Sequence, residues 1–186
     1  MKKVVIGISG ASGTALAVCL LSELKKIPGV ETHLIYTRGA ELTARYEREE
    51  GIGEAIELAD VCYDNEDLGA AAASGTFETE GMIVIPCSMK TAAGIAHGYS
   101  DNLLLRAADV TVKEQRRLVL AVRETPLSPI HLENMLYLSR IPQVCILPAV
   151  LTYYNKPVTI QDMERHIVGK ILKRFDLETE GFRTWQ

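Results

Sequence analysis

In this 186-residue chain, several short apolar runs are followed by stretches rich in serine or threonine, glycine, and lysine or arginine. The first group is GISGASG, which begins at Gly7 and leads from the run VVIGI into an alanine- and leucine-rich segment. Such a turn between a strand and a helix often binds phosphate, because the first N–H groups of the helix have no acceptor inside it. Its glycines are spaced G-x-x-G-x-x-G, which matches neither the dinucleotide fingerprint nor the P-loop. The turn alone therefore leaves the ligand open.

Three further stretches have the same character: TRGAE from Thr37, PCSMKTAAG from Pro86 and RETPLSP from Arg123. Taken alone, each is better explained by an ordinary turn or a helix cap than by a ligand site. The carboxyl ends of neighbouring parallel strands meet at one edge of a sheet, and open α/β sheets bind their ligands there. Together the four stretches predict one site for an anionic ligand.

The elements that must position these turns are short β-branched runs that alternate with longer helical patterns. The predicted strands are Lys3–Ile8, Thr32–Tyr36, Met82–Pro86, Leu118–Val122 and Val144–Leu147. Most are nearly continuous apolar runs, typical of parallel strands that are covered on both faces. Repeated β-α units with right-handed crossovers predict an α/β fold, a Rossmann-like, doubly wound parallel sheet flanked by helices. With no linker or repeat in the sequence, we expect a single domain over residues 1–186.

Two helix starts carry clear signals. Ser128 followed by Pro129 is a cap with proline at the first helical position. TIQD, from Thr159, resembles a capping box, and Met163, Ile167, Ile171 and Phe175 behind it form a helical core stripe. The longest loop-like stretch is 68–81, which we expect on the surface and beside a site.

Composition excludes several classes of protein. The formal net charge of -4 gives no reason to expect nucleic acid as a partner. No apolar run reaches the roughly 20 residues of a membrane span, and the N-terminal MKKVVIGI indicates a first strand and not a signal peptide. The four cysteines are scattered without metal-ligand spacing, so we expect reduced thiols, no metal and a cytoplasmic protein.

Four longer stretches together resemble the UbiX/Pad family of flavin prenyltransferases: GASG, GMIVIPCSMKTAAGIA, DNLLLRAADVTVKEQRRLVLAVRETPLSPIHLENMLYLS and YYNKP. The similarity runs from Lys3 to the C-terminal FRTWQ. It implies an FMN-binding flavoprotein that assembles into a homo-dodecamer. It also implies that dimethylallyl phosphate donates its prenyl group to N5 and then C6 of reduced FMN. The product, prenylated FMN, is the cofactor of UbiD-type decarboxylases, which become the implied partner.

The resemblance assigns the FMN contacts residue by residue. The turn Gly10, Ala11 and Ser12 would lie against the isoalloxazine ring, with Ser12 near N5. Thr37 occupies a position that is usually serine in the family and keeps the hydroxyl. The FMN phosphate would be held at a helix start by four residues, Ser88, Met89, Lys90 and Thr91. Arg123 would hold FMN as a permanent cation.

The same resemblance places the phosphate of the prenyl donor at Lys113, Tyr154 and Lys170, with Arg106 nearby. Lys170 replaces a common arginine, which keeps the charge but loses the guanidinium fork. Trp185 matches a tryptophan whose aromatic face would stabilise cationic character on the allyl group. Three residues would join it in the chemistry: Ser12, Glu47 and Glu124, the last as acid or base.

Without the resemblance, ordinary roles explain many of these residues. Lys113 and Arg106 would be solvated helix charges, Glu47 a solvent-facing carboxylate, and His131 and His166 helix-face residues. Two other functions also stay open: a flavin-dependent cysteine decarboxylase of similar fold, and a non-catalytic FMN carrier that serves a hydroxyarylic acid decarboxylase.

Overall fold

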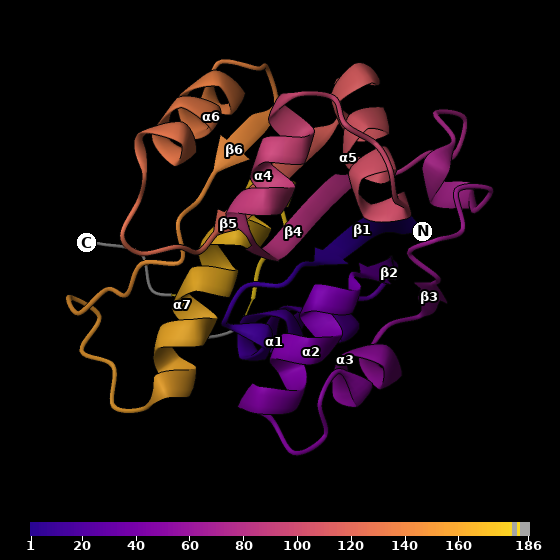
Figure 1. The fold of residues 1–186 in the computed structure, drawn as a ribbon. Helices are drawn as coiled ribbons and strands as arrows, with labels where there is room; N and C mark the ends of the chain where they lie inside the picture. Colours follow the sequence, from indigo (N-terminus) through magenta and orange to yellow (C-terminus); the bar gives the residue numbers. More distant parts are fainter. Residues whose placement is uncertain (180–181, 183–186) are drawn as a thin grey trace.

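Six strands form one parallel sheet at the centre of the molecule (Figure 1). This computed structural model describes residues 1–179 and 182. The strands are β1 Lys2–Ile8, β2 Val30–Tyr36, β3 Val61–Tyr63, β4 Gly81–Cys87, β5 Arg117–Val122 and β6 Val144–Ile146. They lie in the order β3-β2-β1-β4-β5-β6 and every neighbouring pair is parallel. The predicted Rossmann-like, doubly wound α/β fold is confirmed.

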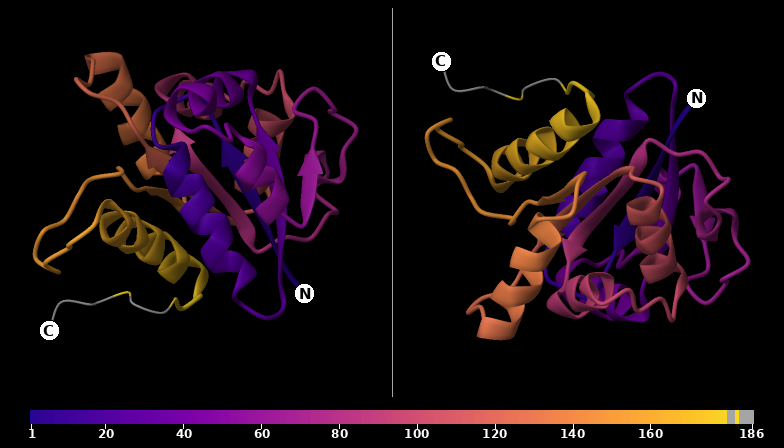
Figure 2. Two further views of the ribbon diagram at one scale, coloured as in Figure 1. Left: turned by 90° about the horizontal axis from the view of Figure 1, so that it is seen from below. Right: turned by 90° about the horizontal axis from the view of Figure 1, so that it is seen from above.

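Helices cover both faces of this sheet (Figure 2). They are α1 Thr14–Lys25, α2 Arg38–Glu47, α3 Gly53–Leu58, α4 Met89–Ala96, α5 Leu103–Lys113, α6 Pro129–Ser139 and α7 Ile160–Leu172. Short 3-10 turns lie at Ala71–Ala73 and Lys173–Phe175. Within the described residues, no helix combines the length and the apolar character that crossing a membrane needs.

Alternate side chains of the strands enter two separate cores, because successive strand residues point to opposite faces. Val4, Ile6 and Ile8 of β1 pack with α1 and α7 in one core. Val5, between them, belongs to the other core, together with side chains of α4, α5 and α6. Helices α5 and α7 therefore lie on opposite faces of the sheet.

The chain reverses its direction of travel across the sheet between β1 and β4. From β1 it proceeds through β2 to β3 at one edge, and from β4 it proceeds through β5 to β6 at the other. The carboxyl ends of β1 and β4 thus flank a topological switch point, where doubly wound sheets bind their ligands. Three of the four stretches predicted to form the site begin at β1, β4 and β5, next to this point.

All five predicted strands are present, with ends that shift by at most two residues. The prediction missed β3, a three-residue strand with the sequence VCY at the edge of the sheet. A strand this short has too few residues to show a hydrophobic period.

The predicted helix starts are also confirmed. The Ser128 hydroxyl accepts the N–H of His131, and the His131 ring accepts the N–H of Ser128, so a histidine completes the capping box of α6. Thr159 and Asp162 form the predicted capping box of α7.

Candidate active site

The turn after β1 contacts the turn after β2 backbone to backbone. A Cβ atom added at Gly10 would lie 3.0 Å from the Cα atom of Gly39, so there is no room for a side chain. The N–H of Thr37 donates to the carbonyl of Ile8 over 3.0 Å, and the Thr37 hydroxyl accepts the N–H of Ala40, which caps α2. Gly10 to Ser12 and Thr37 therefore lie side by side at the carboxyl edge of the sheet.

A carboxylate occupies the N-terminus of α1. The N-cap residue is Gly13, at a φ of 112°, and it has no side chain to cap the helix. Glu47, the last residue of α2, takes this role: its carboxylate accepts the N–H of Gly13 and the N–H of Thr14, each over 2.9 Å, and the Thr14 hydroxyl over 2.6 Å. These donors would otherwise bind a phosphate. The glycine-rich turn is consequently not the phosphate site of this fold.

The same hydrogen bonds set the charge of Glu47. Burial raises its pKa, but hydrogen bonds from Ser12, Thr14 and Gly13 outweigh burial and hold the pKa below its ordinary value. Glu47 is therefore ionised at neutral pH and acts as an acceptor toward the Ser12 side chain. Glu47 is exposed, as expected without the resemblance, but its carboxylate is bound at the start of α1.

We expect Glu47→Ala to lower the free energy of unfolding by about 1 kcal/mol, the usual contribution of a helix N-cap. Because the folded-state pKa is depressed, this contribution is present above the unfolded-state value of 4.5 and is lost as the pH falls through the folded-state pKa. Thermal unfolding of the wild type and variant from neutral to acid pH measures this difference. Glu49→Ala, at an exposed carboxylate nearby, is the control. A difference in stability between the wild type and Glu47→Ala that is the same at acid and neutral pH would refute the assignment.

The turn after β4 begins α4 and presents donors for an anion. The Ser88 hydroxyl accepts the N–H of Thr91 over 3.3 Å and donates to the Thr91 hydroxyl over 3.1 Å. Met89 and Thr91 are buried, whereas Lys90 is exposed. The first N–H groups of α4 have no acceptors within the helix, so this end of α4 favours negative charge. The four residues predicted to hold the FMN phosphate thus form one helix start.

Arg123 lies directly after β5, the strand next to β4. The backbone N–H of Arg123 donates to the carbonyl of Cys87 over 3.0 Å, which ties the β5 turn to the β4 turn. Its half-buried guanidinium has neither a hydrogen bond nor an ion pair with any residue that the structure describes. Glu124, next in sequence, is exposed and accepts the N–H of Thr125. An uncompensated arginine beside the start of α4 fits a phosphomonoester such as FMN.

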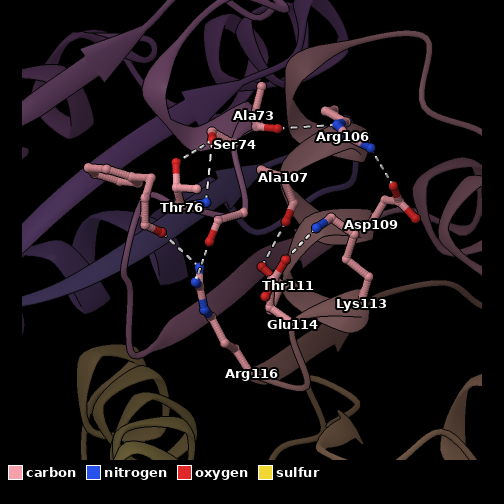
Figure 3. A network of polar contacts seen from close by, with 12 residues as sticks. Ala73, Ser74, Thr76, Arg106, Ala107, Asp109, Thr111, Lys113, Glu114 and Arg116 are labelled. Atoms are coloured by element: carbon pink, nitrogen blue, oxygen red, sulfur yellow. Dashed lines mark hydrogen bonds and ion pairs between the residues drawn. The ribbon is translucent and has the colours of Figure 1, made fainter.

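The predicted donor-phosphate residues on α5 already have protein partners (Figure 3). The Arg106 guanidinium donates to the Ala73 carbonyl over 3.2 Å and to Asp109 over 2.8 Å, and Lys113 pairs with Glu114. In the same network Arg116, which the prediction did not include, binds the carbonyls of Gly75 and Phe77. These contacts hold part of the loop 68–81 against α5.

The other two predicted donor-phosphate residues share a different cavity. Tyr154 and Lys170 both line a cavity of about 850 Å³, together with His166. Oη of Tyr154 lies 3.1 Å from Nε2 of His166, and the two rings meet edge to face. Burial lowers the pKa of His166, and the charge of Lys170 lowers it further, so the ring is neutral at neutral pH. Lys170 itself is exposed, beside the buried Ile171.

His166, expected on a helix face, lies on the inner face of α7, where it is 3% exposed and contacts the predicted site residue Tyr154. The prediction also missed Lys173 and Arg174, which line the same cavity. Their spacing of three and four residues after Lys170 places them on one side of the chain after α7 and could have indicated a cationic surface.

The four predicted donor-phosphate residues are not brought together within one chain. Arg106 and Lys113 belong to α5 and Lys170 to α7, and these helices cover opposite faces of the sheet. Trp185, the fifth residue assigned to the donor, lies outside the described residues. A site that uses both groups therefore needs more than one copy of the chain.

Neither thiol nor metal chemistry is indicated in the described part of the chain. The four cysteines are free, and burial raises the pKa of Cys87 to about 12 and contributes most to a pKa of about 11 for Cys19. Such thiols stay protonated and unreactive. The described residues hold no group of metal-ligating side chains.

Comparison with known proteins agrees with this geometry. A family profile described as Flavoprotein matches residues 1–174. Flavin prenyltransferase LpdB from Lactiplantibacillus plantarum is 48% identical over 186 residues, which cover 100% of this chain and 99% of that protein.

Two solved structures match this chain at more than 40% identity and over nearly its whole length. A dodecameric FMN-dependent UbiX-like decarboxylase from Escherichia coli has a TM-score of 0.96 at 48% identity, over 99% of both chains. AnUbiX (PadA1), solved with FMN and dimethylallyl pyrophosphate, has a TM-score of 0.96 at 43% identity, over 100% of this chain and 97% of that one. The FMN-dependent cysteine decarboxylase SpaF, at 20% identity and a TM-score of 0.60, shares the fold alone. The chain thus belongs to the flavoprotein family, among the UbiX-like flavin prenyltransferases.

Proposed function

We propose that this protein transfers the dimethylallyl group of dimethylallyl phosphate to reduced FMN and makes prenylated FMN for a UbiD-type decarboxylase. The observation that carries the proposal is the arrangement at the switch point, where the start of α4 and the uncompensated Arg123 stand beside the Gly10–Ser12 turn. AnUbiX, a relative of the same fold, was solved with FMN and a dimethylallyl ester. The cytoplasmic location expected from the sequence stays a prediction.

In this proposal the FMN phosphate binds Ser88 to Thr91 and Arg123, since these supply the donors and the cation at one strand edge. The isoalloxazine ring lies against Gly10 to Ser12 and Thr37, on two turns that the close backbone contact of Gly10 with Gly39 holds together. Reduced flavin supplies the nucleophilic N5 atom and, for ring closure, C6.

The first contribution of the protein's side chains is to stabilise the phosphate as it leaves the donor. The allylic C–O bond breaks as the bond to N5 forms, and negative charge grows on the phosphate as it leaves. Lys113 with Arg106 from one chain, and Tyr154 with Lys170 from another, would meet that charge. Trp185 would offer its aromatic face to the allyl group.

Proton movement is the second part. Closing the ring at C6 consumes the alkene bond of the transferred prenyl group: one alkene carbon bonds to C6, the other alkene carbon gains a proton, and C6 loses its own proton. Ser12, hydrogen-bonded to the ionised Glu47, is placed to organise this movement, with Glu124 as the acid or base.

We further propose that the chain forms a homo-oligomer, with a dodecamer as in the Escherichia coli relative. Helix α6 supports this, because four large apolar side chains on it are more than half exposed: Ile130, Leu132, Leu136 and Tyr137. An apolar helix surface of this kind is typical of a protein contact. The separation of Lys113 from Lys170 gives the contact a role in forming the donor site.

Phosphate release distinguishes prenyl transfer from the two alternatives, an FMN carrier and a cysteine decarboxylase. The protein loaded with reduced FMN is mixed anaerobically with dimethylallyl phosphate, and inorganic phosphate is measured. We expect one phosphate for each flavin, and none with oxidised FMN, whose N5 is not nucleophilic. A carrier would bind FMN and release no phosphate, and a cysteine decarboxylase would leave the donor intact.

A further inference from the structure

Ser9 is a buried hydroxyl at the switch point that none of the assigned roles includes. It follows directly after β1 and is 1% exposed. Its position in the sequence, inside GISGASG, gives no sign of a partner, because the residues it contacts lie 77 and 79 positions away.

The Ser9 side chain both donates and accepts a hydrogen bond across the switch point. Its Oγ donates to the carbonyl of Pro86 over 2.9 Å and accepts the backbone N–H of Ser88 over 2.8 Å. The Ser9 N–H also donates to the Pro86 carbonyl over 3.2 Å. These bonds join the end of β1 to the turn between β4 and α4, beyond the last ladder pair of the two strands at Gly7 and Val84.

The residue that Ser9 holds is the N-cap of α4. Ser88 has extended backbone angles, φ -75° and ψ 156°, and its own hydroxyl is used to cap Thr91. With the Ser88 N–H fixed inward on Ser9, the turn is held in the conformation from which α4 begins. Without that acceptor, the partly buried N–H of Ser88 lacks a protein partner, and the turn must shift or admit water to satisfy it.

We propose that Ser9 is a positioning residue for the phosphate of FMN. It does not touch the ligand; it orients Ser88, and through Ser88 the first N–H groups of α4, at the point where the phosphate binds. The inference rests on the proposed placement of that phosphate at Ser88 to Thr91.

The test compares FMN with riboflavin, which has the same ring system and no phosphate. Dissociation constants are measured by quenching of flavin fluorescence for the wild type and Ser9→Ala. We expect Ser9→Ala to weaken FMN binding about 5- to 10-fold, the scale of one hydrogen bond, and riboflavin binding by less than about 2-fold. Thr111→Val is the matched control, because it removes a buried hydroxyl whose bond to the Ala107 carbonyl lies within α5. This control should change neither constant.

Ser9→Cys guards against a failure of Ser9→Ala to fold, since it keeps a side chain but replaces the hydroxyl by a weak hydrogen-bonding group. The same selective loss of FMN affinity is expected for it. Equal losses for FMN and riboflavin, or no loss for either, would overturn the role of Ser9 alone. A wild-type protein that binds riboflavin as tightly as FMN would overturn the proposed phosphate site together with this inference.

Discussion

Ser12→Ala is expected to slow formation of prenylated FMN by about 10²-fold or more, the usual scale for a positioned proton-transfer group. FMN affinity should stay nearly the same, because the proposed phosphate contacts lie on other turns. The physical reason is the contact of Ser12 with Glu47. An ionised carboxylate with a depressed pKa accepts from the serine side chain and keeps it oriented at the turn proposed to face the flavin ring.

The measurement is a single-turnover rate with reduced FMN already bound and dimethylallyl phosphate in excess. Ser22→Ala, which removes a half-buried serine from the middle of α1, controls for general effects on this helix. An unchanged rate for Ser12→Ala would reduce Ser12 to a turn residue and leave Glu124 as the group that moves the proton.

Lys170→Ala is expected to weaken binding of dimethylallyl phosphate by about 10- to 150-fold, the range for one charge-assisted hydrogen bond. FMN affinity should stay constant, because the proposed FMN contacts are Arg123 and the start of α4. Lys170→Arg should keep or raise donor affinity, since a guanidinium restores the fork that phosphate prefers. Titrating the donor into the FMN-loaded protein tests these expectations, with Lys25→Ala on α1 as the control. An unchanged donor affinity in Lys170→Ala would return Lys170 to the helix surface.

The positions of Lys170 on α7 and Lys113 on α5 allow a second experiment, which tests whether the donor site is shared between chains. If one donor site takes Lys113 from one chain and Lys170 from another, Lys113→Ala and Lys170→Ala chains should complement each other. Dissociated and reassembled as a mixture, they should form some sites with both lysines and regain activity that neither variant has alone. Failure of the reassembled mixture to exceed the two variants would argue against a site shared between chains.

The sequence predicted the sheet because its strands are buried on both faces and therefore appear as apolar runs. It predicted the starts of α6 and α7 because caps are local, involving residues three apart such as Ser128 and His131. It missed β3, which is too short to show a period.

The long-range contacts of the site were beyond such reasoning. Glu47 caps α1 from 33 residues away, and Ser9 binds Ser88 from 79 residues away, so no local pattern marks either contact. Periodicity also cannot say which face of the sheet a helix covers. That Lys113 and Lys170 lie on opposite faces follows from the packing of α5 and α7, and it is the reason for proposing a donor site shared between chains.

The mass of the flavin after anaerobic reaction tests the central claim most directly. The wild-type protein is incubated with reduced FMN and dimethylallyl phosphate and then denatured, and the released flavin is analysed by mass spectrometry. We expect a flavin heavier than FMN by one five-carbon prenyl unit, and unmodified FMN when the donor is omitted. Recovery of unmodified FMN alone from the complete reaction, by a protein that binds both ligands, would contradict the assignment of prenyl transfer.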